Sequence, residues 1–313
     1  TEAAAFREKL TQYFADWQSM GVYYATAQED MDTGYDMRIE SHLKEDTNIY
    51  RPYFSRTGTK GTVGGDGYEY FSEEDERKPV RFSGYMLENS LNINNVRDKF
   101  GDYPYVVAIP EDEYFAEEMK TMIALEKRYA EYVEQNYTEV PEQLEELREK
   151  FSSVSTVYQG KQIQLVSGDY QYRTLGYEPY AQYIRRYFSE NGFTYNVNIV
   201  RKNEKADFIN DFMARKTGYC IHFASAAVMM FRSMGIPARY AEGYFADNEC
   251  ITETSGNTVK YNITDKSAHA WVEIYQEGLG WVPVEVTPGT ENFEVNHETV
   301  IPENPTQNTT VAN

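Results

Sequence analysis

The chain has 313 residues and a formal net charge of −20 at pH 7. This length exceeds what one compact core usually holds, so we expect two structural units. The strong negative charge argues against a basic surface that binds nucleic acid or anionic lipid, and polymer partners are expected to be neutral or cationic.

The first half of the chain changes its pattern twice. Residues 1–20 have large apolar side chains at helical spacing, which predicts an amphipathic helix. Residues 31–110 consist of short runs that predict strands and turns, including a strand at 79–86. Residues 111–136 return to helical spacing. Together these elements predict an N-terminal α+β accessory domain at 1–169.

Three further helices are expected along the chain. One starts at Pro141, because proline is favoured in a first helical turn. Another covers residues 179–190 and ends at Asn191-Gly192, a sequence typical of a helix C-terminus. The third covers residues 207–214 and leads directly into a segment that contains a cysteine.

This segment places Cys220 at the beginning of a helix. Gly218 breaks the preceding element, and residues 223–233 are rich in Ala, Met and Val, which predicts a buried helix. On the first turn, the helix dipole and the free N–H groups favour a thiolate and a developing oxyanion. The alternative is that Cys220 is only a small buried apolar residue.

Two alternating runs farther along the chain predict a hairpin whose apolar positions face one core. These positions are Ala270, Val272, Ile274, Val282, Val284 and Val286. His269 and Glu285 share the opposite face. A turn centred near Glu277 or Gly278 brings these two side chains directly or diagonally opposite each other, within about 5 to 8 Å. Glu273 lies four residues along the same strand, roughly 13 Å away, and is therefore the weaker candidate acid.

A cysteine, a histidine and a carboxylate in this arrangement suit nucleophilic catalysis. Glu285 can orient the imidazole through one ring nitrogen while the other nitrogen faces the thiol. Positions two apart on a helix do not face each other, so His222 is expected to line the cleft rim or to pack at the helix start instead of serving Cys220 as a base. Arg239 is expected to form a structural ion pair, with Glu242 as the candidate partner.

Residues 208–288 resemble the core of the bacterial transglutaminase-like superfamily, papain-related enzymes with a Cys-His-Asp triad. Three blocks carry the resemblance, namely Gly218-Tyr219-Cys220, Gly235-Ile236-Pro237-Ala238-Arg239-Tyr240 and His269-Ala270-Trp271-Val272-Glu273. Their spacing resembles that of the membrane-tethered branch. The resemblance implies that Cys220 is the nucleophile, that His269 is the base and that Glu285 replaces the usual Asp.

The same resemblance implies an α+β fold with a papain-like transglutaminase core at 170–292. In this core, the helix that carries the cysteine packs on an antiparallel sheet that carries the histidine and the acid. Tyr195 resembles a tyrosine that some relatives place near the oxyanion, which makes it an oxyanion candidate.

The implied reaction proceeds through an acyl-enzyme on amide or peptide bonds. The substrate would be a protein or peptide, cell-wall peptide included, and neither a cofactor nor a metal is implied. Hydrolysis is favoured narrowly over cross-linking. The alternative is a catalytically silent scaffold that binds peptide or cell wall through the same groove.

The remaining predictions concern cysteine use and location. Cys220 and Cys250 are the only cysteines, so no disulfide framework is expected, and Cys250 is placed in the loop between the Arg239 and His269 strands. Residues 293–313 are polar and rich in Pro, Thr and Asn, which predicts a linker or tail. The resemblance implies a position outside the cell or at its surface, with the membrane tether outside these residues. Composition alone does not choose between this location and the cytosol.

Overall fold

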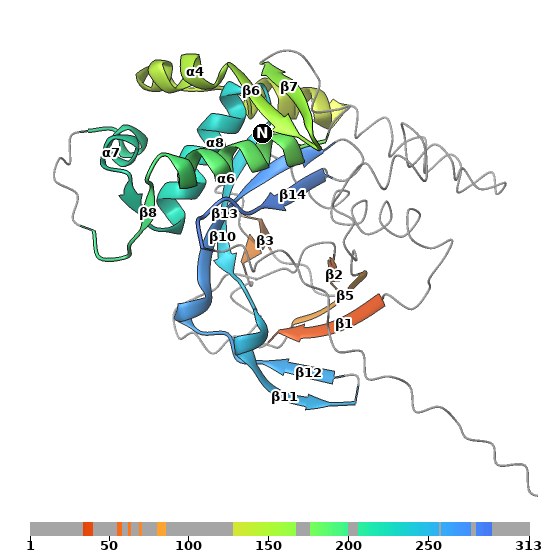
Figure 1. Cartoon of the computed structure of the whole chain (residues 1–313). Coiled ribbons are helices and arrows are strands. Elements are labelled where there is room, and N and C mark those ends of the chain that lie inside the picture. Colours follow the sequence, from red (N-terminus) through yellow and green to blue (C-terminus); the bar gives the residue numbers. More distant parts are fainter. Residues whose placement is uncertain are drawn as a thin grey trace, which may run out of the picture.

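A computed structural model (Figure 1) describes residues 128–166, 176–199, 206–256, 258–276 and 280–289, together with short strands nearer the N-terminus. Predictions for residues 1–20 and 293–313 lie outside the described residues. So does most of the helix predicted at 111–136, of which residues 128–136 are described and are helical.

The N-terminal strands form two small antiparallel sheets. The first has the strand order β1-β5-β2, and in the second β3 pairs with β4. The strand predicted at 79–86 is confirmed as β5. The bounds are Gly34–Ile39 for β1, Ser55–Thr57 for β2, Thr62–Val63 for β3, Glu69–Tyr70 for β4 and Val80–Tyr85 for β5.

The described helices begin and end close to the predicted residues. They are η1 (Glu142–Leu144), α4 (Glu145–Phe151), α6 (Glu178–Glu190), α7 (Phe208–Arg215) and α8 (Cys220–Ser233). Pro141 caps η1, and Pro179 lies in the first turn of α6. Asn191 is the C-cap of α6, and Gly192 adopts a φ of 74° that favours glycine. Asp207 caps α7 by accepting hydrogen bonds from two backbone N–H groups of its first turn.

The central sheet is antiparallel with the order β10-β13-β14. Its strands are β10 (Ala238–Tyr244), β13 (Ala268–Gln276) and β14 (Gly280–Val284). Other strands form pairs: β6 (Ser153–Tyr158) with β7 (Lys161–Val166), β8 (Thr194–Tyr195) with β9 (Thr217–Gly218), and β11 (Ile251–Ser255) with β12 (Thr258–Tyr261). The turns η2 (Asn248–Cys250) and η3 (Asp265–Ser267) flank the β11–β12 hairpin. The described fold is therefore mixed α+β.

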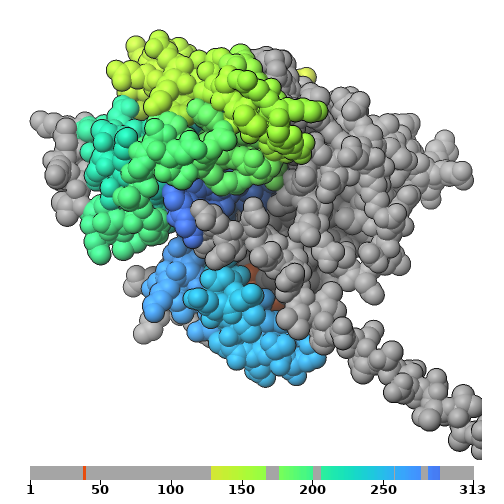
Figure 2. Space-filling model, viewed as in Figure 1, coloured from red at the N-terminus to blue at the C-terminus, as the bar shows by residue number. Residues whose placement is uncertain are grey.

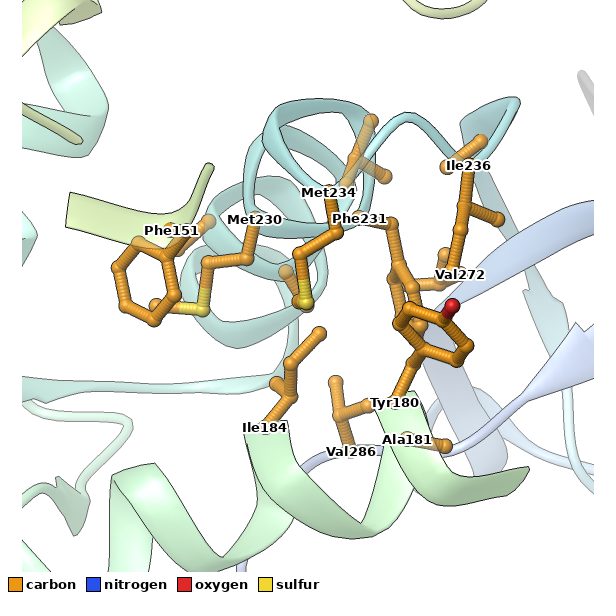
Figure 3. Packing of buried hydrophobic residues seen from close by; sticks show 14 of the residues in the cluster. Phe151, Tyr180, Ala181, Ile184, Met230, Phe231, Met234, Ile236, Val272 and Val286 are labelled. Atoms are coloured by element: carbon orange, nitrogen blue, oxygen red, sulfur yellow. The ribbon is translucent and has the colours of Figure 1, made fainter. Parts of the chain in front are cut away.

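The main core lies between α8 and one face of the central sheet. All six apolar hairpin positions predicted to face one core are buried. Figure 3 shows side chains of α8 meeting those of α6 and of the sheet. Those labelled include Met230 and Phe231 from α8, Met234 directly after it, Tyr180 and Ile184 from α6, and Val272 from β13. Burial of these apolar surfaces holds α8 against α6 and the sheet.

This core continues across the predicted domain boundary between residues 169 and 170. Phe151 of α4, Val154 of β6 and Leu165 of β7 are buried in the same cluster as the residues of α6 and α8. The space-filling view (Figure 2) likewise shows the yellow-green segment 142–166 directly against α6. These apolar side chains are buried because they pack in one cluster with side chains of α8. The division of the chain into domains stays a prediction.

The other face of the central sheet carries a second, smaller core at one end. Tyr275 and Trp281 pack against Ala130 and Val133 of the helical residues 128–136. The indole Nε1 of Trp281 also donates a hydrogen bond to the hydroxyl of Tyr129 at 2.8 Å. The hairpin is thus covered on both faces at this end, whereas sequence alternation predicted only the first core.

Candidate active site

Cys220 is the first residue of α8, as predicted. Tyr219, the residue before it, has an extended backbone and forms the N-cap. Cys220 is 8% exposed and lies in a small cluster with Ala224 of the same helix and Ala270 of β13. Neither Cys220 nor Cys250 forms a disulfide, and Cys250 lies in η2 between β10 and β13, as expected. The thiol therefore sits at the positive end of the helix dipole, beside the sheet.

His269 and Glu285 meet at one end of the same sheet, where β13 begins and β14 has just ended. The β13–β14 register pairs Val272 with Val284. When this register is extended, Glu285 falls diagonally from His269, one of the two arrangements that the sequence allowed. His269 Nε2 lies 2.5 Å from Glu285 Oε2. The longer side chain of Glu, compared with Asp, therefore reaches the imidazole.

The carboxylate and backbone of Glu285 are held by further contacts. Its Oε1 accepts hydrogen bonds from the backbone N–H groups of Val286 at 2.9 Å and Thr287 at 2.7 Å. Arg185 of α6 donates from Nη1 to the carbonyl oxygen of Glu285 at 3.0 Å. One carboxylate oxygen is thus fixed by the chain itself, and this leaves the other for the imidazole.

The thiol of Cys220 completes a continuous chain of hydrogen bonds. Its side chain bonds the imidazole of His269. Since Nε2 of that ring faces Glu285, Nδ1 is the nitrogen available to the thiol. The three side chains predicted to act together are therefore in contact, in the order Cys220, His269, Glu285.

These contacts shift the pKa of all three groups. Burial raises the pKa of the Cys220 thiol, but the hydrogen bond and charge of His269, with the N–H groups of Ala270 and Ile221, outweigh it and hold the pKa below its usual range. Burial lowers the pKa of His269, yet its bonds to Cys220 and Glu285 raise it to about 9. Burial also raises the pKa of Glu285, but His269 and Thr287 outweigh this effect and lower it. The arrangement favours a thiolate, an imidazolium and a carboxylate near neutral pH.

Tyr195 lies next to Cys220 on a separate short strand. Strand β8 pairs in parallel with β9, so that Tyr195 stands opposite Gly218. The hydroxyl of Tyr195 lies within hydrogen-bond reach of Cys220, and the side chain is 47% exposed. Burial of part of the ring raises the pKa of Tyr195, and the negative charge of Cys220 raises it further. The hydroxyl is therefore a proton-bearing donor beside the thiol.

Two other sequence predictions have clear outcomes. His222 is buried and packs at the helix start, the second of the two positions expected for it. The partner predicted for Arg239 was wrong, because Arg239 pairs with Glu273 on the neighbouring strand. Glu242 lies three positions along β10 from Arg239 and therefore points to the other face, where it accepts a hydrogen bond from Tyr240 at 2.8 Å.

Several contacts of the site had no usable signal in the sequence. Arg185 lies on a polar stretch of α6 and resembles any surface arginine until the fold brings it to Glu285. The backbone N–H groups of Ala270 and Thr287 contribute to the site through their position alone. Backbone donors carry no residue signature, so only the structure identifies them.

Within the described ranges, no three His, Cys, Asp or Glu side chains are grouped so that they could hold a metal ion. None of the helices that the structure describes has the length and apolar composition of a transmembrane segment.

Residues 172–286, which include Cys220, His269 and Glu285, match the model of the transglutaminase-like superfamily. This part of the chain is a transglutaminase-like superfamily domain. The matched residues contain the thiol, the imidazole and the carboxylate in one continuous stretch of sequence.

Two curated relatives are similar to parts of the chain. The chain is 40% identical to the uncharacterized protein YebA of Bacillus subtilis over 113 residues, which is 35% of this chain and 15% of YebA. It is 37% identical to a protein-glutamine gamma-glutamyltransferase of Pseudomonas aeruginosa over 83 residues, which is 26% of this chain and 12% of that protein. The match thus spans 15% or less of the length of these curated relatives.

A solved structure is also similar over a larger part of the chain. It is the periplasmic domain of TgpA from Pseudomonas aeruginosa bound to ethylmercury, with 19% sequence identity and a TM-score of 0.41. The superposition covers 81% of this chain and 71% of that chain.

Proposed function

We propose that the transglutaminase-like domain is a cysteine enzyme that acts on amide or peptide bonds through an acyl-enzyme. One observation carries this proposal: Cys220, His269 and Glu285 form a single chain of hydrogen bonds that lowers the pKa of the thiol. A thiolate beside an imidazolium is the combination that nucleophilic catalysis requires.

In the first half of the reaction, the Cys220 thiolate adds to the substrate carbonyl carbon. The carbonyl oxygen becomes an oxyanion, which the backbone N–H of Cys220 and the hydroxyl of Tyr195 can stabilise. His269 then gives its proton to the leaving nitrogen, the carbon–nitrogen bond breaks, and ammonia or an amine departs. The acyl group remains on the sulfur as a thioester.

In the second half, a water molecule or an amine attacks the thioester. His269 takes a proton from this second nucleophile, and the carbon–sulfur bond breaks to release a carboxylic acid or a new amide. The thiolate and the imidazolium are restored. Throughout both halves Glu285 keeps the imidazole oriented, because one of its oxygens bonds Nε2 while backbone N–H groups hold the other.

We favour hydrolysis of the acyl-enzyme over transfer to an amine. The side chain of Tyr195, beside the thiol, is 47% exposed, so water reaches this side of the site. Transfer is the second candidate, and it is favoured by the 37% identity to a protein named protein-glutamine gamma-glutamyltransferase. The substrate in either case is a protein or peptide, cell-wall peptide included.

A peptide library incubated with the protein and a labelled primary amine tests both outcomes by mass spectrometry. Chain cleavage or deamidation indicates hydrolysis, whereas incorporation of the labelled amine indicates transfer. Every product should be absent with Cys220→Ala. Products that persist in this variant, or a library that is unchanged by the wild type, would contradict the proposal.

A catalytically silent scaffold that binds peptide through the same groove is the competing function. Such a protein has no need for a thiol with a depressed pKa. Stoichiometric alkylation of Cys220 by iodoacetamide at pH 6 supports the enzyme, and alkylation as slow as that of a free cysteine supports the scaffold.

We further propose a location outside the cytoplasm, because the motif spacing resembles that of the membrane-tethered branch. Treatment of intact cells with a protease tests this location, since only a domain outside the cytoplasm would be cleaved.

A further inference from the structure

His222 is a buried imidazole that the proposed mechanism does not use. Only 5% of the residue is exposed. Its ring stacks on Phe208 at 4.6 Å between centroids, with an interplanar angle of 26°, and meets the edge of the Tyr219 ring, also at 4.6 Å. Phe212 packs on it at 5.5 Å. An imidazole enclosed by aromatic rings beside Cys220 is well placed to fix the local backbone.

The imidazole of His222 also lies directly against the backbone of Gly218. A methyl group at Gly218 would come within 2.7 Å of His222 Cβ and 2.8 Å of its Cγ, distances that real contacts do not allow. Glycine is therefore required here by the close approach of the His222 side chain. Gly218 and His222 form one packed unit.

His222 further holds the residue that precedes the nucleophile. Its Nδ1 accepts a hydrogen bond from the backbone N–H of Tyr219 at 3.4 Å. His222 is the third residue of α8, from which side chains reach back to the N-cap in a capping box. The side chain thus ties the start of α8 to the backbone just before Cys220.

Gly218 connects this unit to the strand that carries Tyr195. Tyr195 stands opposite Gly218 in the β8–β9 pair, and the carbonyl oxygen of Gly218 accepts a hydrogen bond from Asn196 N at 2.7 Å. The backbone of Gly218 therefore lies between the imidazole of His222 and strand β8. A shift of the imidazole would move β8 relative to Cys220.

We propose that His222 is a positioning residue for the oxyanion site. Together with Gly218 it sets the separation between β8 and the start of α8, and so keeps the hydroxyl of Tyr195 and the N–H of Cys220 close enough to act on one substrate oxygen. This inference rests on the proposed function. The imidazole that bonds the sulfur is that of His269, so His222 acts on addition to carbonyls and not on formation of the thiolate.

Two small probes separate these effects in the whole protein. With p-nitrophenyl acetate, the Cys220 sulfur adds to a carbonyl, an oxyanion forms and p-nitrophenolate leaves. With iodoacetamide, the same sulfur displaces iodide and no oxyanion forms. The ratio of the acylation rate to the alkylation rate therefore reports the oxyanion site independently of thiolate content.

His222→Phe keeps an aromatic ring in the packed unit but removes the acceptor for Tyr219 N–H. We expect the ratio to fall by about tenfold, since small displacements of catalytic groups have effects of this order or larger. His222→Gln restores an acceptor of the type preferred at this helix position, and its ratio should stay within about threefold of the wild type. The alkylation rate and its pH profile should be unchanged in both variants.

Phe223→Leu is the matched control, because Phe223 is buried in the same helix but packs against Phe188 and Phe193. It should lower the melting temperature without changing the ratio. A wild-type ratio in His222→Phe, an equal fall in Phe223→Leu, or a parallel loss of alkylation in His222→Phe would each overturn the inference. Failure of the proposed function would give a different result. The wild type would then turn over no amide substrate, although its reactions with p-nitrophenyl acetate and iodoacetamide would remain measurable.

Discussion

The two ends of strand β13 each hold a glutamate against a basic side chain. Near its start, His269 bonds Glu285 and also the thiol of Cys220. Four residues farther along, Glu273 bonds Arg239 of the neighbouring strand β10. Both pairs project from the same face of the sheet, because residues 269 and 273 have the same parity.

The surroundings of the two pairs differ. The guanidinium of Arg239 lies 4.2 Å from the centre of the Trp281 ring, and the Tyr129 hydroxyl that bonds this indole comes from the helical residues 128–136. Glu273 is buried there. The pair at the other end lies beside the thiol and near the half-exposed Tyr195. The Arg239–Glu273 pair contributes to stability, and the pair beside the thiol can perform chemistry.

The basic groups explain why only one pair can be catalytic. A guanidinium stays protonated at every pH that a protein tolerates, so Arg239 cannot exchange a proton with a substrate. An imidazole gains and loses a proton within the physiological range or close to it. Position along one strand therefore gives Glu273 a partner that cannot exchange protons and Glu285 a partner that can.

The largest effect is expected from Cys220→Ala. This substitution should reduce amide-directed turnover to less than about 1% of the wild type, because loss of an acting nucleophile ordinarily costs far more than about 10²-fold. The melting temperature should change little, since alanine fits the small site beside Ala224 and Ala270. Steady-state kinetics and thermal unfolding measure the two effects. Turnover above that level would show that the catalytic end of β13 serves another nucleophile.

The next effect concerns the two histidines near the thiol. His269→Ala should return the pKa of Cys220 towards that of a free thiol and slow alkylation at pH 6 by about 10²-fold, because the thiolate fraction falls. His222→Ala should leave this alkylation rate nearly unchanged. Iodoacetamide kinetics compare the variants directly. Equal effects, or effects in the reverse order, would refute the assignment of His269 as the base.

The two glutamates provide the most direct test of the comparison. Glu285→Gln should lower turnover by about 10² to 10⁴, because an amide can present its NH₂ group to the imidazole and favour the wrong tautomer. Glu273→Gln should leave turnover nearly intact. It should instead lower the free energy of unfolding by about 1 to 2 kcal/mol, since it weakens the bond to Arg239, whose side chain is partly exposed.

Kinetics and chemical denaturation of both variants measure these expectations. Glu285→Asp is the conservative control, and it should keep at least about a tenth of wild-type turnover if the backbone moves by about a bond length. Such a movement is feasible because Glu285 lies just beyond the end of β14. A severe loss of turnover in Glu273→Gln together with a near-normal Glu285→Gln would exchange the two roles.

The smallest effect is a dependence on pH that only the catalytic end should show. The pKa of His269 is raised to about 9, so its contribution to stability is fully present below the unfolded value of 6.5 and is lost as the pH rises through about 9. Turnover should fall over the same alkaline range, since the imidazolium that protonates the leaving group disappears. Both effects are measured as turnover and melting temperature between pH 6 and 10. In Glu285→Gln, the fall in turnover should occur at lower pH.

Local patterns in the sequence were sufficient to predict the helix and the hairpin that carry the site. The glycine before Cys220 and the apolar run after it predicted a thiol at a helix start, which α8 confirms. Strict alternation around His269 and Glu285 predicted a hairpin with both side chains on one face, and the contact between them agrees. Such periodicities are properties of a single strand or helix, so they can be read without knowing the fold.

Tertiary structure decided which groups contact one another between elements. Pairing of β10 with β13 chose Glu273 over Glu242 as the partner of Arg239. The packing of α6 brought Arg185 to the carbonyl of Glu285, and residues 128–136 covered the second face of the sheet. These contacts depend on register and on the packing of segments distant in the chain. No local pattern records either property, since each is set by the apolar surfaces that the whole chain must bury together.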